Sequence, residues 1–241
     1  MKYRADLSGI PYPEVSELHQ ADFNGEHNEV IINNLSNVGD FVWFSDGKRM
    51  AILTRTQGSN TINILNVLTG VTEFSLKAQD IGLEDLAMFA LSADEKTILI
   101  YGLNLKNGHS EAQIVIYSLE TQTTLNSFLP DQIIPSGNKN YPIPTILDGT
   151  NAGWIGGNRW FLASINTPGG DCYNYALFFF DTHDLQNSFC VPSAGGIIDY
   201  PTISPDLTKI GYVTVVGPGE YYVVIGKLTS NILDKLDVRE K

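Results

Sequence analysis

One short pattern occurs three times along this chain of 241 residues. Each copy has the apolar end of one strand, a serine, an acidic turn with a lysine or its neighbour, and the apolar start of the next strand. The copies are Phe44–Leu53, Leu91–Ile100 and Ile203–Tyr212. About 50 residues separate the first two copies, and about twice that distance separates the second from the third, which predicts an array of small repeated sheets.

The interval between the second and third copies leaves room for a degenerate copy near residue 150. There, Trp154–Ala163 has the turn and the following strand but has lost the serine and the acid. Periods of about 40 to 50 residues are typical of four-stranded β-propeller blades. The sequence therefore predicts an all-β fold, a β-propeller with about four visible blades. A β-sandwich with unrelated hairpins is the alternative.

The repeats also predict how the chain is divided. Residues 1–35 are expected to be an N-terminal extension and residues 229–241 a C-terminal tail, with the propeller between them at 36–228. The expected blades cover about 38–77, 86–129, 144–192 and 197–228.

Closure of the ring is left open by the sequence. If Glu29–Asn33 adds an outer strand to the fourth blade, four blades close the ring and no sheet edge is left free. Otherwise the chain is part of a larger ring, or two chains share one ring. Residues Met1–His27 show no clear period and are expected to be irregular. The tail fits a short helix or a weak outer strand.

The blade pattern resembles the TolB-type and prolyl-oligopeptidase-type propeller repeat, a WD-like pattern that reads Ser-Pro-Asp-Gly-Lys, a strand, a loop, a strand, and Asp-Leu-x-Thr-Gly. Ser45–Lys48 together with Asn66–Gly70 is the copy most similar to it, without the proline. Ser204–Asp206 keeps the proline, and Phe180–Thr182 is what the third blade retains. The resemblance covers about residues 38–228. It implies blades rather than an activity, because related repeats occur in binding modules, peptidase gates and polysaccharide lyases.

The charge balance excludes some partners. The net charge is −12, and there is no basic run. A surface that follows a phosphate backbone needs clustered Lys and Arg, so nucleic acid is not expected as a partner. No stretch approaches the roughly 18 to 20 apolar residues of a membrane helix. The charged start, Met1–Asp6, lacks the apolar core of a signal peptide, so a cytoplasmic protein is expected if Met1 is the native start.

The two cysteines, Cys172 and Cys190, flank a predicted hairpin that turns at Asp181–Asp184. Continuing its strands places Cys190 roughly 10 Å along a strand from the position opposite Cys172. A disulfide needs Cα atoms within about 7 Å. Two free thiols are therefore expected.

The serines and aspartates of the repeats are interpreted as turn residues, because their side chains bind nearby backbone amides and hold tight turns. The sequence has no Gly-x-Ser-x-Gly nucleophile motif, no paired histidines or cysteines at metal-binding spacing, and no phosphate-binding loop. We therefore expect no catalytic residue, no metal and no cofactor.

Propellers carry function on the loops at one rim, between the second and third strands and between successive blades. Here residues 104–112 and 166–174 are long and polar, and 130–144 is longer still. Long loops in compact domains are often functional. The candidate binding residues in or near these segments are His109, Tyr141, Asp171, Tyr173 and Tyr200. An exposed tyrosine has an apolar face and a hydroxyl, which suits contacts with a protein or a glycan.

The predicted function is therefore that of a non-catalytic β-propeller, a binding or scaffold module that recognises a protein partner, or else a small ligand or glycan, through loops on one rim. The alternative is a propeller enzyme, or the propeller domain of one, that acts on peptides or acidic sugars. That alternative rests on the resemblance alone. A cluster of ionisable side chains at the mouth of the channel would favour it.

Overall fold

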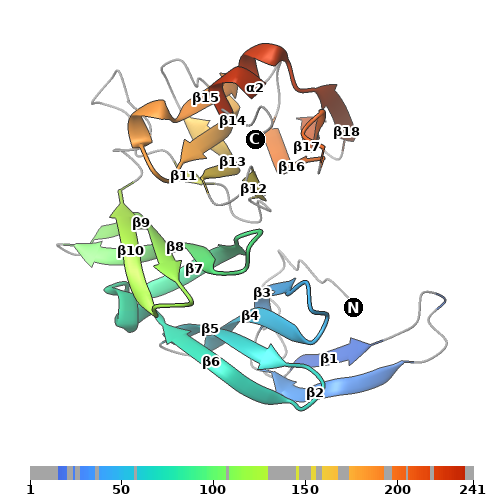
Figure 1. Ribbon diagram of the computed structural model, residues 1–241, viewed down its shortest axis with the longest axis vertical. Coiled ribbons are helices and arrows are strands. Elements are labelled where there is room, and N and C mark those ends of the chain that lie inside the picture. The colour runs from blue at the N-terminus through green and yellow to red at the C-terminus, as the bar shows by residue number, and fades with distance from the viewer. Residues whose placement is uncertain are drawn as a thin grey trace. The chain divides into compact units, whose positions relative to one another are not determined.

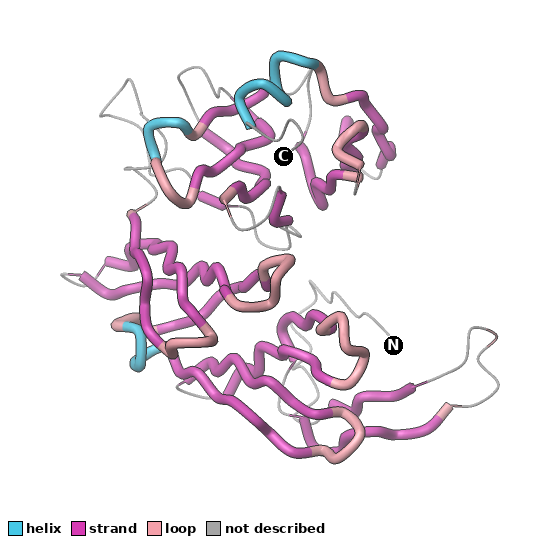
Figure 2. The backbone as a smooth tube through the Cα atoms, in the orientation of Figure 1, coloured by secondary structure: helices cyan, strands magenta, loops and turns pink. Residues whose placement is uncertain are grey.

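Antiparallel strands make up most of the computed structural model (Figures 1 and 2). It describes residues 16–20, 24, 28–35, 38–56, 59–106, 109–129, 145–146, 153–155, 159–167, 174–192, 197–204, 206–217 and 220–236. The chain has two compact units, Met1–Met88 and Phe89–Lys241.

The first unit holds a two-stranded sheet and the first four-stranded sheet. The small sheet pairs β1 (Ser16–Gln20) with β2 (Glu29–Leu35). The larger sheet has the order β3 (Val38–Trp43), β4 (Arg49–Thr56), β5 (Ser59–Asn66) and β6 (Val71–Lys77). Its buried face includes Met50, Ile52 and Leu65, and the short helix η1 (Ala78–Ile81) follows β6.

The second sheet has the order β7 (Asp85–Leu91), β8 (Thr97–Lys106), β9 (His109–Ser118) and β10 (Thr123–Phe128). The boundary between the two units falls within β7. In the first unit, Asn60 of β5 donates its side-chain amide to the Leu86 carbonyl of β7 at 2.8 Å. The first residues of β7 are therefore held against the first sheet.

The third sheet joins β12 (Gly153–Ile155), β13 (Trp160–Thr167), β14 (Asn174–Asp181) and β15 (Phe189–Pro192) in this order. The short strand β11 (Thr145–Ile146) pairs with the far end of β13, and the short helix η2 (Leu185–Asn187) precedes β15. The fourth sheet has three described strands, β16 (Ile197–Ile203), β17 (Lys209–Gly217) and β18 (Glu220–Lys227), and the helix α2 (Ser230–Leu236) follows them.

Apolar side chains join the third and fourth sheets into one core in the second unit. Trp160 and Phe179 from the third sheet share a buried cluster with Ile198 and Ile210 from the fourth, and Leu236 of α2 closes it. The second and third sheets also touch, because the Trp154 indole donates to the Ala90 carbonyl at 3.3 Å. Within the second unit, the third and fourth sheets thus pack through their apolar faces, and the second and third sheets are in contact through β7 and β12.

The same backbone hydrogen bond occurs once in each of the four sheets. The residue after the third strand donates its N–H to a carbonyl just before the second strand. The four pairs are Val67 to Lys48, Leu119 to Lys96, Thr182 to Arg159, and Leu228 to Thr208, at 2.8–3.0 Å. Four up-and-down antiparallel sheets with equivalent turns are β-propeller blades, so the predicted fold class is confirmed, and the sheets are called blades one to four below.

The N-terminal segment differs from the sequence-based expectation. The stretch Met1–His27 was expected to be irregular, but Ser16–Gln20 forms β1 and pairs with β2. The pairing has two register shifts and the strand has no regular apolar alternation, which explains why no pattern predicted it. Pairing of Glu29–Asn33 with blade four, and the closure that it would bring, stay predictions.

Candidate functional site

The turn between the first two strands of blade one is held by a carboxylate. Asp46 Oδ1 accepts the backbone N–H groups of Lys48 and Arg49 at 2.8 and 2.9 Å, and its Oδ2 accepts Arg49 Nε at 2.6 Å. These hydrogen bonds, first of all the one from the Arg49 side chain, lower the pKa of Asp46 to about 2. The carboxylate is used entirely for local turn contacts.

Blades two and four build the same turn with a serine. Ser92 Oγ donates to Asp94 at 2.7 Å and accepts the Thr97 N–H at 2.9 Å. Ser204 Oγ does the same with Asp206, at 2.6 Å, and with the Lys209 N–H, at 2.9 Å. These serines and aspartates therefore make the turn hydrogen bonds that the sequence predicts for them.

The structure changes how the first copy of the repeat is aligned. The Phe44 N–H bonds to the Arg49 carbonyl, just as the Ser204 N–H bonds to the Lys209 carbonyl. Phe44 therefore occupies the serine position, and Ser45 occupies the position of the repeat's proline. Blade one therefore has no serine at the position from which Ser92 and Ser204 donate to the turn aspartate. The Arg49 side chain donates to Asp46 instead.

A second set of side chains caps the turn between the third and fourth strands. Asn66 Oδ1 accepts the N–H groups of Leu68 and Thr69 in blade one, and Ser118 Oγ accepts that of Thr121 in blade two. Asp181 takes this place in blade three. Such side chains stabilise turns by replacing backbone acceptors.

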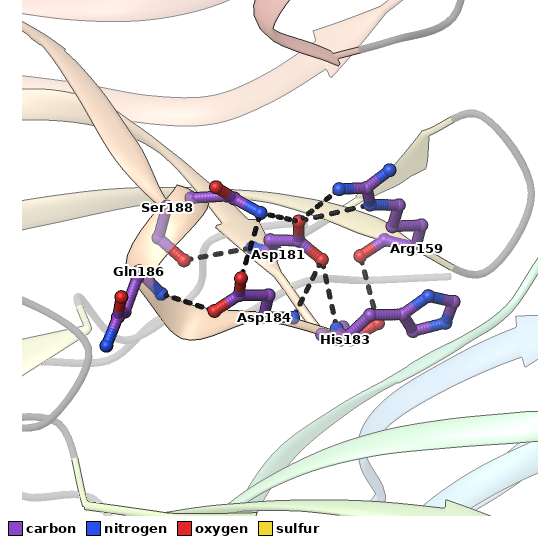
Figure 3. Close-up of polar contacts among 8 residues, drawn as sticks. Arg159, Asp181, His183, Asp184, Gln186 and Ser188 are labelled. Atoms are coloured by element: carbon purple, nitrogen blue, oxygen red, sulfur yellow. Dashed lines mark hydrogen bonds and ion pairs between the residues drawn. The ribbon is translucent and has the colours of Figure 1, made fainter.

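Asp181 is the centre of a polar network in blade three (Figure 3). Its side chain is fully buried, and its Oδ1 accepts the N–H groups of His183 and Asp184 at 2.9 and 3.2 Å. Its Oδ2 accepts two hydrogen bonds from Arg159. Burial alone would raise the pKa of Asp181, but the bonds from Arg159 and from the two amides outweigh it and lower the pKa.

This network is best explained as the way blade three compensates for its degenerate repeat. The turn before β13 lacks the serine and the aspartate. Arg159 reaches from that turn to Asp181 in the other turn at the same end of the blade. One ion pair with a buried carboxylate thus joins the two turns of blade three. In blade two, the exposed pair Lys96–Glu120 joins the equivalent turns at 3.6 Å.

The opposite end of the blades carries the turns between second and third strands and the connections from one blade to the next. We call it the loop end. In the second unit, three points of the chain lie there: the connection from Lys106 to His109, the connection from Thr167 to Asn174, and the start of β16 at Ile197. The antiparallel order of each sheet places these points at the same end of their blades, away from the aspartate turns.

The candidate binding residues are placed only in part. His109 begins β9 at the loop end, where it pairs with Lys106, and Tyr200 lies within β16. Tyr141, Asp171 and Tyr173 lie outside the described residues. In sequence, Tyr141 falls in the connection between blades two and three, and the other two fall between β13 and β14. A binding role for these five residues stays a prediction.

The described residues also bear on two other classes of site, metal centres and membrane spans. Across the described strands and turns, no three His, Cys, Asp or Glu side chains gather as a metal-binding group would. In the same part of the chain, no helix combines the length and the apolar character needed to cross a membrane.

The expectation of two free thiols is wrong, because Cys190 of β15 is disulfide-bonded. The sequence has one other cysteine, Cys172, which lies outside the described residues. The expectation continued a strand as far as residue 172, but β14 begins at Asn174. The register of β14 and β15 therefore does not determine the distance between Cys190 and Cys172, which precedes β14.

The chain matches no protein-family model and no curated protein sequence. It is similar to solved structures. TolB from Acinetobacter baumannii is 21% identical with a TM-score of 0.60, and the match covers 88% of this chain and 46% of that one. An uncharacterized protein from Listeria monocytogenes is 11% identical with a TM-score of 0.53, covering 89% and 57%.

A third solved structure, the dihydro-heme d1 dehydrogenase NirN in complex with DHE, is 14% identical with a TM-score of 0.51, covering 90% of this chain and 41% of that one. The chain has a TolB-like β-propeller fold. The resemblance deduced from the repeats is therefore confirmed at the level of fold. This TolB-like propeller spans about half the length of the structures it matches.

Proposed function

We propose that this TolB-like propeller is a non-catalytic module that binds a protein partner through its loop end. The observation that carries the proposal is that the repeat carboxylates at the other end already serve the fold. Asp46, Asp181 and Asp206 each accept backbone amides of their own turn. We call the end that carries these aspartate turns the framework end, and we assign recognition to the loop end.

The chemistry of the loop end suits a protein surface. The connection between blades two and three at residues 129–144 is the longest connection between strands of the second unit, and the segment 168–173 joins β13 to β14 at the same end. Long connections that a rigid sheet positions are common recognition elements. Tyr141, Tyr173 and Tyr200 would supply aromatic contact area with a polar end, as protein interfaces favour. A glycan or small ligand is the other class that such tyrosines suit.

A comparison of two variants in a pull-down experiment tests the proposal. One variant replaces Tyr141, Tyr173 and Tyr200 by alanine. Its matched control is Leu68→Ala, which changes a side chain that is 70% exposed in a turn at the framework end. The proposal expects proteins retained by the wild type and by the control to be lost from the triple variant. Equal retention by all three proteins would contradict it.

The enzyme alternative is tested on the same proteins. Wild type and triple variant are incubated with peptide and acidic-sugar libraries, and the products are measured by mass spectrometry. The proposal expects no turnover above that of heat-denatured protein. Turnover that the wild type shows and the triple variant loses would identify the loop end as a catalytic site and overturn the non-catalytic proposal.

A further inference from the structure

The outer strand of blade four exposes an apolar surface. Tyr221, Val223 and Ile225 are 68%, 75% and 72% exposed and occupy alternate positions of β18, so they share one face of the strand. Tyr222 is also exposed. Within the described part of the chain, β18 is the last strand of its sheet and has β17 on one side only.

The last strands of blades one and two are more polar. On β6 the exposed side chains are Val71, Thr72, Glu73, Ser75 and Lys77, and on β10 they are Thr, Asn and Ser with the single apolar residue Leu125. Polar and charged side chains on an edge strand discourage pairing with another chain. The interior of β18 has neither a charge nor a proline, so its edge lacks this protection.

In blades one to three, a side chain caps the turn that leads from the third strand to the fourth. Among the described residues of blade four, no such side chain follows β18. The repeated hydrogen bonds align Lys227 with Asn66, Ser118 and Asp181. A lysine has no acceptor atom for turn amides, and the chain continues into α2 instead of turning back as a fourth strand. Leu236 and Leu228 are buried in the core, so α2 packs there, and no described strand pairs with the second edge of β18.

We propose that a second copy of this chain occupies the edge, with the two β18 strands paired antiparallel about Val223. A two-fold axis through this residue places Val223 beside its symmetry mate and Tyr221 beside Ile225 of the partner subunit. These pairs of β-branched and aromatic side chains stabilise sheets. Glu220 of each strand also lies near Lys227 of the other strand, so that residues of opposite charge are neighbours at both ends of the pair.

A second copy fits the edge better than the N-terminal strand does. In β2, which reads Glu-Val-Ile-Ile-Asn-Asn-Leu, each series of alternate residues includes an asparagine. The β18 strand of another subunit instead offers three consecutive apolar positions on one face. The second copy therefore places apolar residues beside apolar residues at all three positions. The same residues of both subunits form the contact, as in other two-fold interfaces.

The test measures solution mass by light scattering for the wild type and for charge variants. The wild type is expected to have twice the 26.5 kDa of one chain. Val223→Lys and Val223→Glu are each expected to have the mass of one chain, because each places two like charges side by side at the centre of the pair. A mixture of the two variants is expected to restore the double mass. The matched control, Leu125→Lys, makes the same change on the polar strand β10, at a side chain 58% exposed, and is expected to keep the wild-type mass.

Three outcomes would overturn the proposal. A wild type with the mass of one chain would mean that no second copy covers the edge. A Val223→Lys protein that keeps the double mass would place the contact elsewhere. A mixture of the lysine and glutamate variants that stays at the mass of one chain would exclude the pairing about Val223.

Discussion

Arg159 donates two hydrogen bonds to one carboxylate oxygen of Asp181, from Nε at 3.0 Å and from Nη2 at 2.8 Å. The two residues lie in different turns of blade three, and the carboxylate is fully buried. A buried charge that loses its partner is costly, because neither water nor another side chain replaces the lost contacts. This pair is thus the most sensitive point among the described polar contacts.

The first prediction follows from this pair. Asp181→Ala leaves the Arg159 side chain and the His183 and Asp184 amides without their acceptor. We expect a loss of about 2–3 kcal/mol in the free energy of unfolding, measured by urea denaturation. The matched control is Asp184→Ala in the same turn, where an exposed carboxylate accepts the Gln186 N–H and the Asn187 side-chain amide, and it should cost about 1 kcal/mol as the loss of a cap. Equal losses would show that burial of the pair is unimportant.

The second prediction concerns acid stability. Hydrogen bonds lower the pKa of Asp46 and Asp206 to about 2, below their value of about 4 in an unfolded chain. The folded state therefore binds protons less readily, so these groups stabilise it above about pH 4, and the contribution is lost as the pH falls towards about 2. The double variant Asp46→Asn with Asp206→Asn should show a weaker fall in the urea midpoint over this range. Leu68→Ala should keep the wild-type slope.

The third prediction tests the backbone of the turns before the fourth strands. Gly70 and Gln122 both have positive φ, 68° and 54°. A Cβ at Gly70 would meet no atom within 4 Å, so the cost of Gly70→Ala comes from the backbone alone and should be about 1 kcal/mol. Gln122→Gly should stabilise by a similar or smaller amount, since Gln122 is exposed. Thermal denaturation should move the two melting temperatures in opposite directions, and shifts of the same sign would contradict the argument.

The fourth prediction concerns the disulfide of Cys190. A native disulfide typically stabilises a fold by about 2–4 kcal/mol. Reductant should therefore lower the denaturation midpoint of the wild type but leave Cys190→Ser unchanged. A wild type that reductant does not affect would contradict a stabilising role.

The same bond gives a test of localisation. Disulfides persist in oxidising compartments and are rare where thiols are kept reduced. Alkylation of thiols at the moment of cell lysis, followed by mass spectrometry, reports the state of Cys190 in the cell. Alkylated Cys190 would indicate a reducing compartment such as the cytoplasm, and an intact disulfide would indicate an oxidising compartment.

The local turns were predictable because their hydrogen bonds span few residues. Asp94 binds the amide two residues later, and Asp206 does the same, so residue type and spacing suffice. The alignment of the first copy was wrong by one residue, because Ser45 stands beside Asp46 in the sequence. Only the hydrogen bond between Phe44 and Arg49 shows which residue begins the turn.

Contacts between distant residues were not predictable. Nothing in the sequence links Arg159 to Asp181, pairs Ser16–Gln20 with β2, or brings a second cysteine to Cys190. Each depends on where a strand begins or on how two turns meet, and composition carries no signal for either. Loop length and residue type predict the five candidate binding residues. The structure places the backbone of two of them, His109 at the start of β9 and Tyr200 within β16.

The sequence by itself determined the blades, because a repeated turn and alternating apolar strands are local patterns that recur at a constant interval. The tertiary structure alone decided how each blade is completed. Blade three uses an ion pair with a buried carboxylate between turns, and in blade four the last described strand ends at Lys227 and is followed by α2, which enters the core. The physical reason is that a strand edge or a buried charge is satisfied by whichever group lies beside it in space, and the fold, rather than the order of residues, sets that neighbour.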